Sequence, residues 1–130
     1  MEATTAGNIL IIDNDEALLA LLERRLGRFG YGCDTAVSGG QGLAGFDPSR
    51  HELVVTDLNM PGGDGVELAR TIRETSDVPI VVVTGYRDAF RNRVRRIPGV
   101  TVIEKPFDLN DLVDLIDTEV ATWRAFRNAA

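Results

Sequence analysis

Five short runs of apolar residues, rich in Val and Ile, alternate along this chain of 130 residues with stretches in which apolar residues recur every three or four positions. The runs are Ile9–Ile12, Cys33–Val37, Leu53–Thr56, Ile80–Thr84 and Thr101–Ile103. The helical stretches between and after them are 18–29, 39–46, 66–72, 89–97 and 109–123, the last preceded by Asp108 in the position of an N-cap. This alternation predicts a parallel sheet with helices on both faces, which is a doubly wound α/β domain.

Composition narrows the class of protein further. The chain holds 20 acidic and 14 basic residues, giving a net charge of −6, and 44% of its residues are apolar, so it is neither collagenous nor disordered. No apolar run approaches the roughly 20 residues of a membrane helix, and the first residues lack the basic and apolar regions of a secretory signal. Cys33 is the single cysteine and cannot form an internal disulfide. We therefore expect a cytoplasmic protein.

The expected organisation is an N-terminal tail at 1–8, one domain at 9–120 and an extension of the last helix at 121–130. The extension carries two aromatic residues, Trp123 and Phe126. Packing on the domain is the favoured interpretation of these aromatics, and weak self-association through this end is a further hypothesis. The few residues after the domain cannot hold a DNA-binding helix-turn-helix, so nucleic acid is not an expected partner. A membrane is not an expected partner either, because the apolar runs are too short to span one.

Basic residues are concentrated in one segment. Arg87–Arg96 contains five arginines and one acid, Asp88. A solvated helix face is the favoured interpretation, and a docking surface for an acidic partner is the alternative.

Polar side chains follow four of the five predicted strands at the point where each strand ends. They are Asp13-Asn14-Asp15, Asp57, Thr84 and Lys105. The carboxyl ends of parallel strands meet at one edge of the sheet, and these four strands would be neighbours if the sheet order is 2-1-3-4-5. We therefore expect the four groups to surround one crevice.

Carboxylates that converge on one crevice repel each other, so one must be protonated or a cation must join them. Oxygen ligands alone favour Mg²⁺. Lys105, the only lysine of the chain, and the Thr84 hydroxyl would then supply donors for a further anion. Together these groups indicate a site for phosphoryl transfer. The bond from Lys105 to Pro106 is one at which a cis peptide costs little.

These motifs identify a family resemblance that runs from about Ile9 to Val120. The string Thr56–Gly65 (TDLNMPGGDG), Val83-Thr84-Gly85 and Glu104-Lys105-Pro106-Phe107, together with the acidic stretch after the first strand, resemble a response-regulator receiver domain of two-component signalling. The resemblance implies a (βα)5, flavodoxin-like (CheY-like) fold with a parallel sheet of order 2-1-3-4-5. It also implies a phosphoacceptor domain that catalyses its own phosphorylation and dephosphorylation and is not otherwise an enzyme.

The resemblance implies a role for each site residue. Asp57 accepts the phosphoryl group from a histidine kinase or a histidine phosphotransfer protein and then switches the binding of a downstream protein. Thr84 binds the phosphoryl group, and Lys105 pairs first with Asp57 and then with that group. Mg²⁺ is held by Asp57, by Asp13 through water, by Asn14 and by the backbone carbonyl of Asn59. Gly65 supplies backbone angles that other residues avoid.

Two positions depart from the family's pattern. Asn14 stands where the family usually has a second acid that binds Mg²⁺ directly, so we expect weaker binding of Mg²⁺ and slower, but not absent, phosphorylation. Val102 stands where an aromatic residue usually swings inward as the threonine moves. Tyr86 is a substitute for that aromatic residue or simply an exposed loop residue.

Two other functions compete with this interpretation. A degenerate receiver that only binds partners is favoured by Asn14 and Val102 and opposed by Asp57, Thr84 and Lys105. A phosphatase of the haloacid-dehalogenase type would use Asp13 and Asp15, but it leaves Asp57 without a role.

Overall fold

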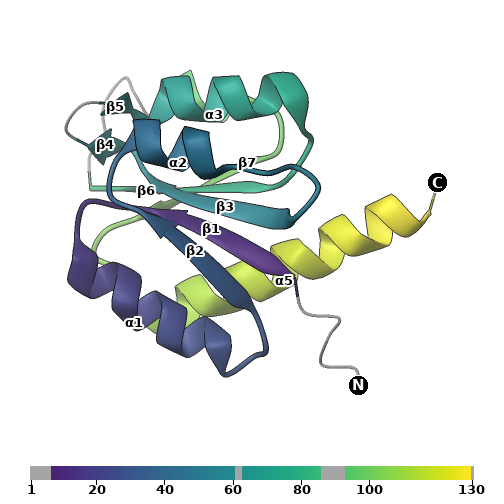
Figure 1. The fold of residues 1–130 in the computed structure, drawn as a ribbon, viewed down its shortest axis with the longest axis horizontal. Coiled ribbons are helices and arrows are strands. Elements are labelled where there is room, and N and C mark those ends of the chain that lie inside the picture. The colour runs from purple at the N-terminus through teal and green to yellow at the C-terminus, as the bar shows by residue number, and fades with distance from the viewer. Residues whose placement is uncertain (1–6, 61–62, 86–92, 130) are drawn as a thin grey trace.

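The computed structural model describes residues 7–60, 63–85 and 93–129, and its centre is a five-stranded parallel sheet (Figure 1). The strands are β1 (Asn8–Ile12), β2 (Gly32–Ala36), β3 (His51–Asp57), β6 (Ile80–Thr84) and β7 (Val100–Glu104). Their order is β2-β1-β3-β6-β7, which confirms the predicted order 2-1-3-4-5. A short antiparallel pair, β4 (Asn59–Met60) and β5 (Gly63–Asp64), follows β3 and was not predicted.

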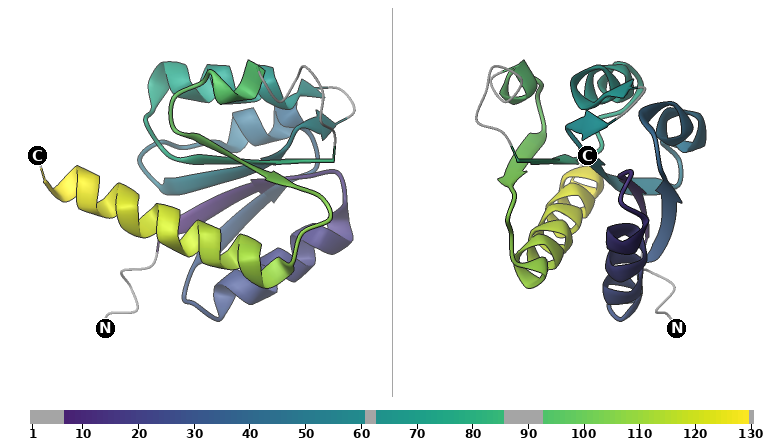
Figure 2. Two further views of the ribbon diagram at one scale, coloured as in Figure 1. Left: turned by 180° about the vertical axis from the view of Figure 1, so that it is seen from behind. Right: turned by 90° about the vertical axis from the view of Figure 1, so that its left-hand side faces the viewer.

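Helices cover both faces of the sheet, as predicted. They are α1 (Glu16–Gly27), α2 (Gly39–Gly45), α3 (Gly65–Thr75) and α5 (Leu109–Asn128). Figure 2 shows α1 and α5 on one face and α2 and α3 on the other. Of the helix predicted at 89–97, residues 89–92 lie outside the described residues, and 93–95 are helical. No helix in the described ranges is both long and apolar enough to cross a membrane.

Alternation of side chains along the strands divides the core into two layers. Ile9, Ile11, Leu53 and Val55 pack with the buried residues of α1 and α5. Leu10, Ile12 and Val54 point to the opposite face and pack with those of α3. Every residue of β3 is buried, because this central strand has helices on both sides.

An extra residue at the start of β3 anchors the end of α5. Asn8 pairs with His51 and Ile9 with Leu53, so Glu52 is a bulge in the ladder between β1 and β3. The Glu52 side chain is only 9% exposed, and its carboxylate accepts hydrogen bonds from Arg124 at 2.6 and 2.8 Å and from Arg127 at 3.2 Å. A buried carboxylate needs such partners, so this contact holds the last turns of α5 against the sheet.

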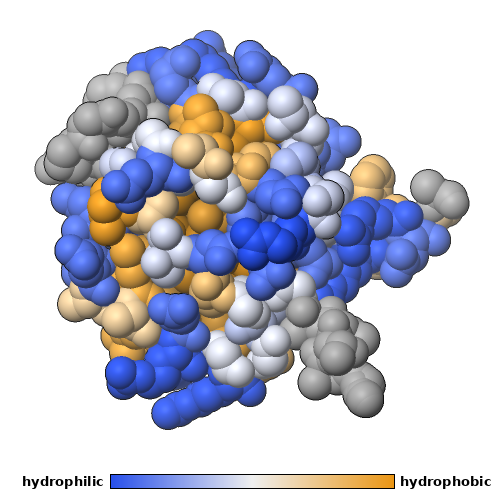
Figure 3. Space-filling view, in the orientation of Figure 1, coloured by the Kyte–Doolittle hydropathy of each residue, from blue (hydrophilic) through white to orange (hydrophobic). Residues whose placement is uncertain are grey.

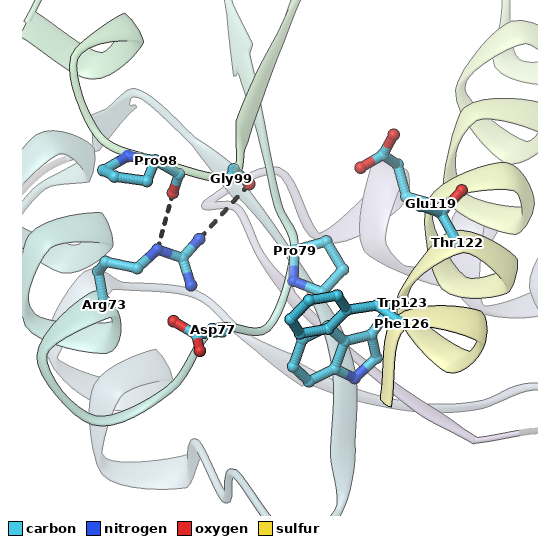
Figure 4. A pocket seen from close by; sticks show the side chains of 9 residues that line it. All are labelled: Arg73, Asp77, Pro79, Pro98, Gly99, Glu119, Thr122, Trp123 and Phe126. Atoms are coloured by element: carbon cyan, nitrogen blue, oxygen red, sulfur yellow. Dashed lines mark hydrogen bonds between the residues drawn. The ribbon is translucent and has the colours of Figure 1, made fainter. Parts of the chain in front are cut away.

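A groove of about 320 Å³ lies beside these last turns, at the amino ends of β6 and β7 (Figure 4). The Trp123 ring lies beside Pro79 there and stacks on Phe126 at a centroid distance of 5.9 Å. Trp123 is half-buried, whereas Phe126 is 65% exposed, so only the first of these aromatics packs on the domain as expected. Arg73 borders the groove and donates to the carbonyls of Pro98 and Gly99.

The face seen in Figure 1 carries apolar atoms over α2 and over the sheet between α2 and α1 (Figure 3). Hydrophilic atoms lie between these apolar atoms, and a mixed surface of this kind is ordinary for a folded domain.

Candidate functional site

Asp57 and Lys105 meet at the carboxyl end of the sheet. Asp57 is the last residue of the central strand β3 and is 7% exposed, while Lys105 directly follows β7. The Lys105 Nζ lies 3.6 Å from Asp57 Oδ2, which is an ion-pair distance longer than a direct hydrogen bond. The structure thus brings together two residues that are 48 positions apart in the chain.

Strand pairing places Thr84 at the same edge. Asp57 is paired with Val83, and Thr84 follows Val83 at the end of β6. The Lys105 N–H donates to the Thr84 carbonyl at 2.8 Å, so β7 carries Lys105 out of the sheet beside the buried Thr84. The peptide bond from Lys105 to Pro106 is cis.

Asp13 is the second buried carboxylate of the site, at 4% exposure. Burial raises the pKa of Asp13 above its usual value, and the negative charge of Asp57 raises this pKa further. A hydrogen bond from the Asp15 N–H at 2.8 Å and the charge of Lys105 act in the opposite direction on the same pKa. Asp13 therefore belongs to the same electrostatic cluster as Asp57 and Lys105.

The two residues after Asp13 differ from it. Asn14 is exposed. Asp15 is the N-cap of α1 and accepts hydrogen bonds from the N–H groups of Ala17 and Leu18. The structure therefore gives Asp15 a capping role, with both hydrogen bonds on its Oδ1 atom, in place of the catalytic role that a haloacid-dehalogenase phosphatase would assign to it.

Gly65 is required for space and not for an unusual backbone angle. Its φ lies outside the left-handed range, but a Cβ there would stand 2.7 Å from the Asp57 carbonyl oxygen and 2.8 Å from Leu58 Cα. The expectation that Gly65 supplies angles avoided by other residues was therefore wrong. Only a residue without a Cβ lets α3 begin so close to the end of β3.

The donor atoms of the site fit Mg²⁺ by their chemistry. The negative charge of Asp57 raises the pKa of the buried Asp13, and a divalent cation between the two carboxylates would relieve this repulsion. The exposed Asn14 carries an uncharged amide oxygen, and the backbone of Asn59 lies in β4, two residues after Asp57. Among the residues that the structure describes, no group of three or more His, Cys, Asp or Glu side chains is arranged to hold a metal.

Several predicted features lie away from this cluster or outside the described residues. Val102 packs against the core layer on the α3 side. Tyr86 lies outside the described residues, so the idea that it substitutes for the aromatic residue the family usually has at position 102 stays a prediction. The same holds for Arg87 and Arg91 of the basic segment, whereas Arg95 and Arg96 are exposed.

Thr56 is a residue of this region that sequence reasoning passed over. It is fully buried, and its hydroxyl donates to the carbonyl of Asp57 at 3.0 Å. Thr is common in strands, so a Thr at the end of Leu53–Thr56 gives no signal beyond strand formation. The available signals were a lone hydroxyl in an otherwise apolar run and its place at the start of the string Thr56–Gly65.

Comparison with known sequences gives one family. Residues 9–117 match the family model of the response regulator receiver domain. The chain is 34% identical over 115 residues to the transcriptional regulatory protein ResD of Bacillus subtilis, covering 87% of this chain and 48% of ResD. It is 35% identical over 112 residues to the transcriptional regulatory protein PrrA of Mycobacterium tuberculosis, covering 84% of this chain and 48% of PrrA. The chain thus spans about half the length of these curated relatives.

Solved structures agree with the sequence comparison. A CheY-like receiver domain protein from Methanospirillum hungatei JF-1 aligns with a TM-score of 0.83 and 26% identity, over 93% of this chain and 98% of that one. The non-phosphorylated HemR receiver domain from Leptospira biflexa aligns with a TM-score of 0.80 and 28% identity, over 88% and 94% of the two chains.

Proposed function

The chain belongs to the response regulator receiver domain family, and we propose that it accepts a phosphoryl group on Asp57 from the phosphohistidine of a histidine kinase or of a histidine phosphotransfer protein. A carboxylate oxygen of Asp57 attacks phosphorus, an O–P bond forms, the N–P bond to the imidazole breaks, and the imidazole leaves as a neutral ring after taking up a proton. The product on this chain is an acyl phosphate. We propose that this product changes the affinity of the domain for a downstream protein in the cytoplasm.

The observation that carries the proposal is the pairing of Lys105 Nζ with Asp57 Oδ2 at 3.6 Å. A phosphoryl group on Asp57 brings further negative charge, and the compact ammonium of Lys105 is placed to neutralise it. Thr84 ends the strand next to β3, where its hydroxyl would donate to a phosphoryl oxygen. When bound, Mg²⁺ would neutralise phosphoryl oxygens during transfer, held by Asp13, Asp57, Asn14 and the Asn59 carbonyl.

Intact-mass measurement after incubation with a small acyl phosphate tests this function. With Mg²⁺ we expect the mass gain of one phosphoryl group on the native chain, and we expect no gain on D57N. The matched control is D77N, because Asp77 is an exposed acid that borders the groove at the opposite edge of the sheet. A mass gain that persists in D57N, or no gain on the native chain at any Mg²⁺ concentration, contradicts the proposal.

A second candidate, a receiver that binds partners without phosphorylation, is favoured by the uncharged and exposed Asn14. It predicts no mass gain at any Mg²⁺ concentration, together with partner binding that is the same for the native chain and D57N. The phosphodonor experiment therefore separates the two functions.

We also propose weak self-association through the end of α5, because Phe126 is 65% exposed beside the groove. Sedimentation velocity at rising concentration tests this. A concentration-independent monomer contradicts it.

A further inference from the structure

Thr56 places a hydroxyl in an otherwise apolar layer of the core. It lies on β3 between Val54 and Leu58, pairs with Ile12 and Val82 on the neighbouring strands, and is 0% exposed. All four of these neighbours belong to the core layer on the α3 side. A buried hydroxyl costs free energy unless it is hydrogen-bonded, so its bond to the Asp57 carbonyl compensates for its burial.

The position of Thr56 excludes direct contact with the reacting atoms. Adjacent side chains of a strand point to opposite faces of the sheet, so Thr56 and Asp57 lie on different sides. Any influence of the Thr56 hydroxyl on phosphorylation must therefore pass through the backbone.

The backbone group concerned is the peptide that joins Asp57 to Leu58. Its carbonyl accepts from Thr56 Oγ1 at 3.0 Å, and its N–H donates to the Val83 carbonyl at 2.9 Å. Pairing between β1 and β3 ends at Ile12 and Thr56, one residue before Asp57. The same carbonyl oxygen faces the start of α3, where Gly65 leaves room for it.

We propose that Thr56 is a positioning residue for the phosphoacceptor. Its hydroxyl fixes the plane of the peptide after Asp57, and this plane sets the backbone angle ψ of Asp57 and the path of the chain toward the Asn59 carbonyl. The carboxylate is thereby held in the orientation from which it attacks phosphorus. This inference rests on the proposed function of Asp57.

The test compares T56V with T56S in phosphorylation by a small acyl phosphate at saturating donor and Mg²⁺. We expect T56V to lower the rate constant about 10-fold, because small displacements of a reacting group are costly, and T56S to stay within about 2-fold of the native chain. The matched control is T71V, which removes another hydroxyl-to-carbonyl bond, from Thr71 to Glu67 on α3, away from the site. We expect T71V to react at the native rate.

Two further measurements separate positioning from stability. Unfolding by urea establishes that T56V is fully folded at the assay temperature, and the Leu58 amide resonance is expected to shift in T56V and to return toward its native position in T56S. Native rates in a folded T56V, or equal slowing in T56V and T56S, would overturn the inference. If the proposed function itself fails, the native chain gains no phosphoryl group, which is a different outcome from either of these.

Discussion

Replacing Gly65 by alanine tests the close contact between the end of β3 and the start of α3. The new Cβ would lie 2.7 Å from the Asp57 carbonyl oxygen, 2.8 Å from Leu58 Cα and 3.0 Å from the Leu58 oxygen. All three are backbone atoms, so no side chain can rotate away. The shortest contact falls about 0.7 Å below the 3.4 Å at which ordinary contact begins, so either α3 or the end of β3 must move.

The expected cost follows from these contacts. Overpacking that shifts backbone typically costs about 1–3 kcal/mol, and the better helix propensity of alanine recovers little of it at the first position of a helix. We expect urea unfolding, followed by circular dichroism, to show a loss of free energy of unfolding in this range for G65A. Because the displaced atoms belong to Asp57 and Leu58, phosphorylation should slow as well.

A second glycine supplies the control. A Cβ on Gly27, the last residue of α1, would meet nothing within 4 Å, and its φ lies outside the left-handed range. G27A should therefore raise the free energy of unfolding by about 0.4–1 kcal/mol through the lower entropy of the unfolded chain. A G65A protein at least as stable as the native chain, with native phosphorylation, would refute the reasoning about this junction.

Three further perturbations probe the charges of the fold. N14D adds a carboxylate beside Asp13 and should tighten the binding of Mg²⁺ several-fold, as measured in a titration followed by nuclear magnetic resonance. An unchanged affinity for Mg²⁺ would contradict this account of the site. D13N should raise the free energy of unfolding at pH 7 without Mg²⁺. The pKa of Asp13 is raised in the folded chain above its usual value of 3.8, so the native chain loses stability as the pH rises from 3.8 through the folded pKa, and D13N has no carboxylate to ionise there. Urea unfolding of the native chain and of D13N at pH 3 and pH 7 checks this. If the free energy of unfolding changes equally between the two pH values in the two proteins, the account is contradicted. R124A leaves Glu52 with Arg127 alone and should lower the free energy of unfolding by about 2–3 kcal/mol in urea. A decrease no larger than that of R95A, a variant at an exposed arginine, would contradict the role of Glu52 as an anchor for α5.

Periodicity was enough to predict the five strands of the parallel sheet and the helices between them, whereas the order of the strands was implied by the family resemblance. Long alternating segments carry a strong signal because each element must bury an apolar face. The Asp108 cap and the continuation of α5 as far as Asn128 followed from the same reasoning. The cis bond before Pro106 fell where proline makes one inexpensive.

Contacts between distant residues could not be predicted in this way. Glu52 and Arg124 are 72 positions apart, and nothing in either neighbourhood indicates a partner. The pair β4 and β5 has only two residues per strand, which is too short for a periodic signal. Phe29 continues the apolar spacing of α1, yet the helix ends at Gly27 and Phe29 is 53% exposed, because the chain turns at Gly30, whose φ is 92°, and the Tyr31 N–H donates to the Leu26 carbonyl.

Only part of the candidate site could be predicted from the sequence. The meeting of Lys105 with Asp57 agrees with the topology, since Asp57 ends one parallel strand and Lys105 directly follows another. That Gly65 is needed for space depends on a distance of a few ångströms, which a sequence does not contain.

The bulge at Glu52 has a consequence for how this domain tolerates insertions and deletions. A one-residue slip in a strand exchanges its two faces, so in β3 it would turn the Asp57 carboxylate into the apolar core and the Thr56 hydroxyl toward the crevice. The irregularity falls between His51 and Leu53, ahead of the paired segment that runs from Leu53 with Ile9 to Thr56 with Ile12. A change of one residue in the chain before Leu53 can be absorbed there, at the expense of the α5 anchor, while the phosphoacceptor keeps its side of the sheet.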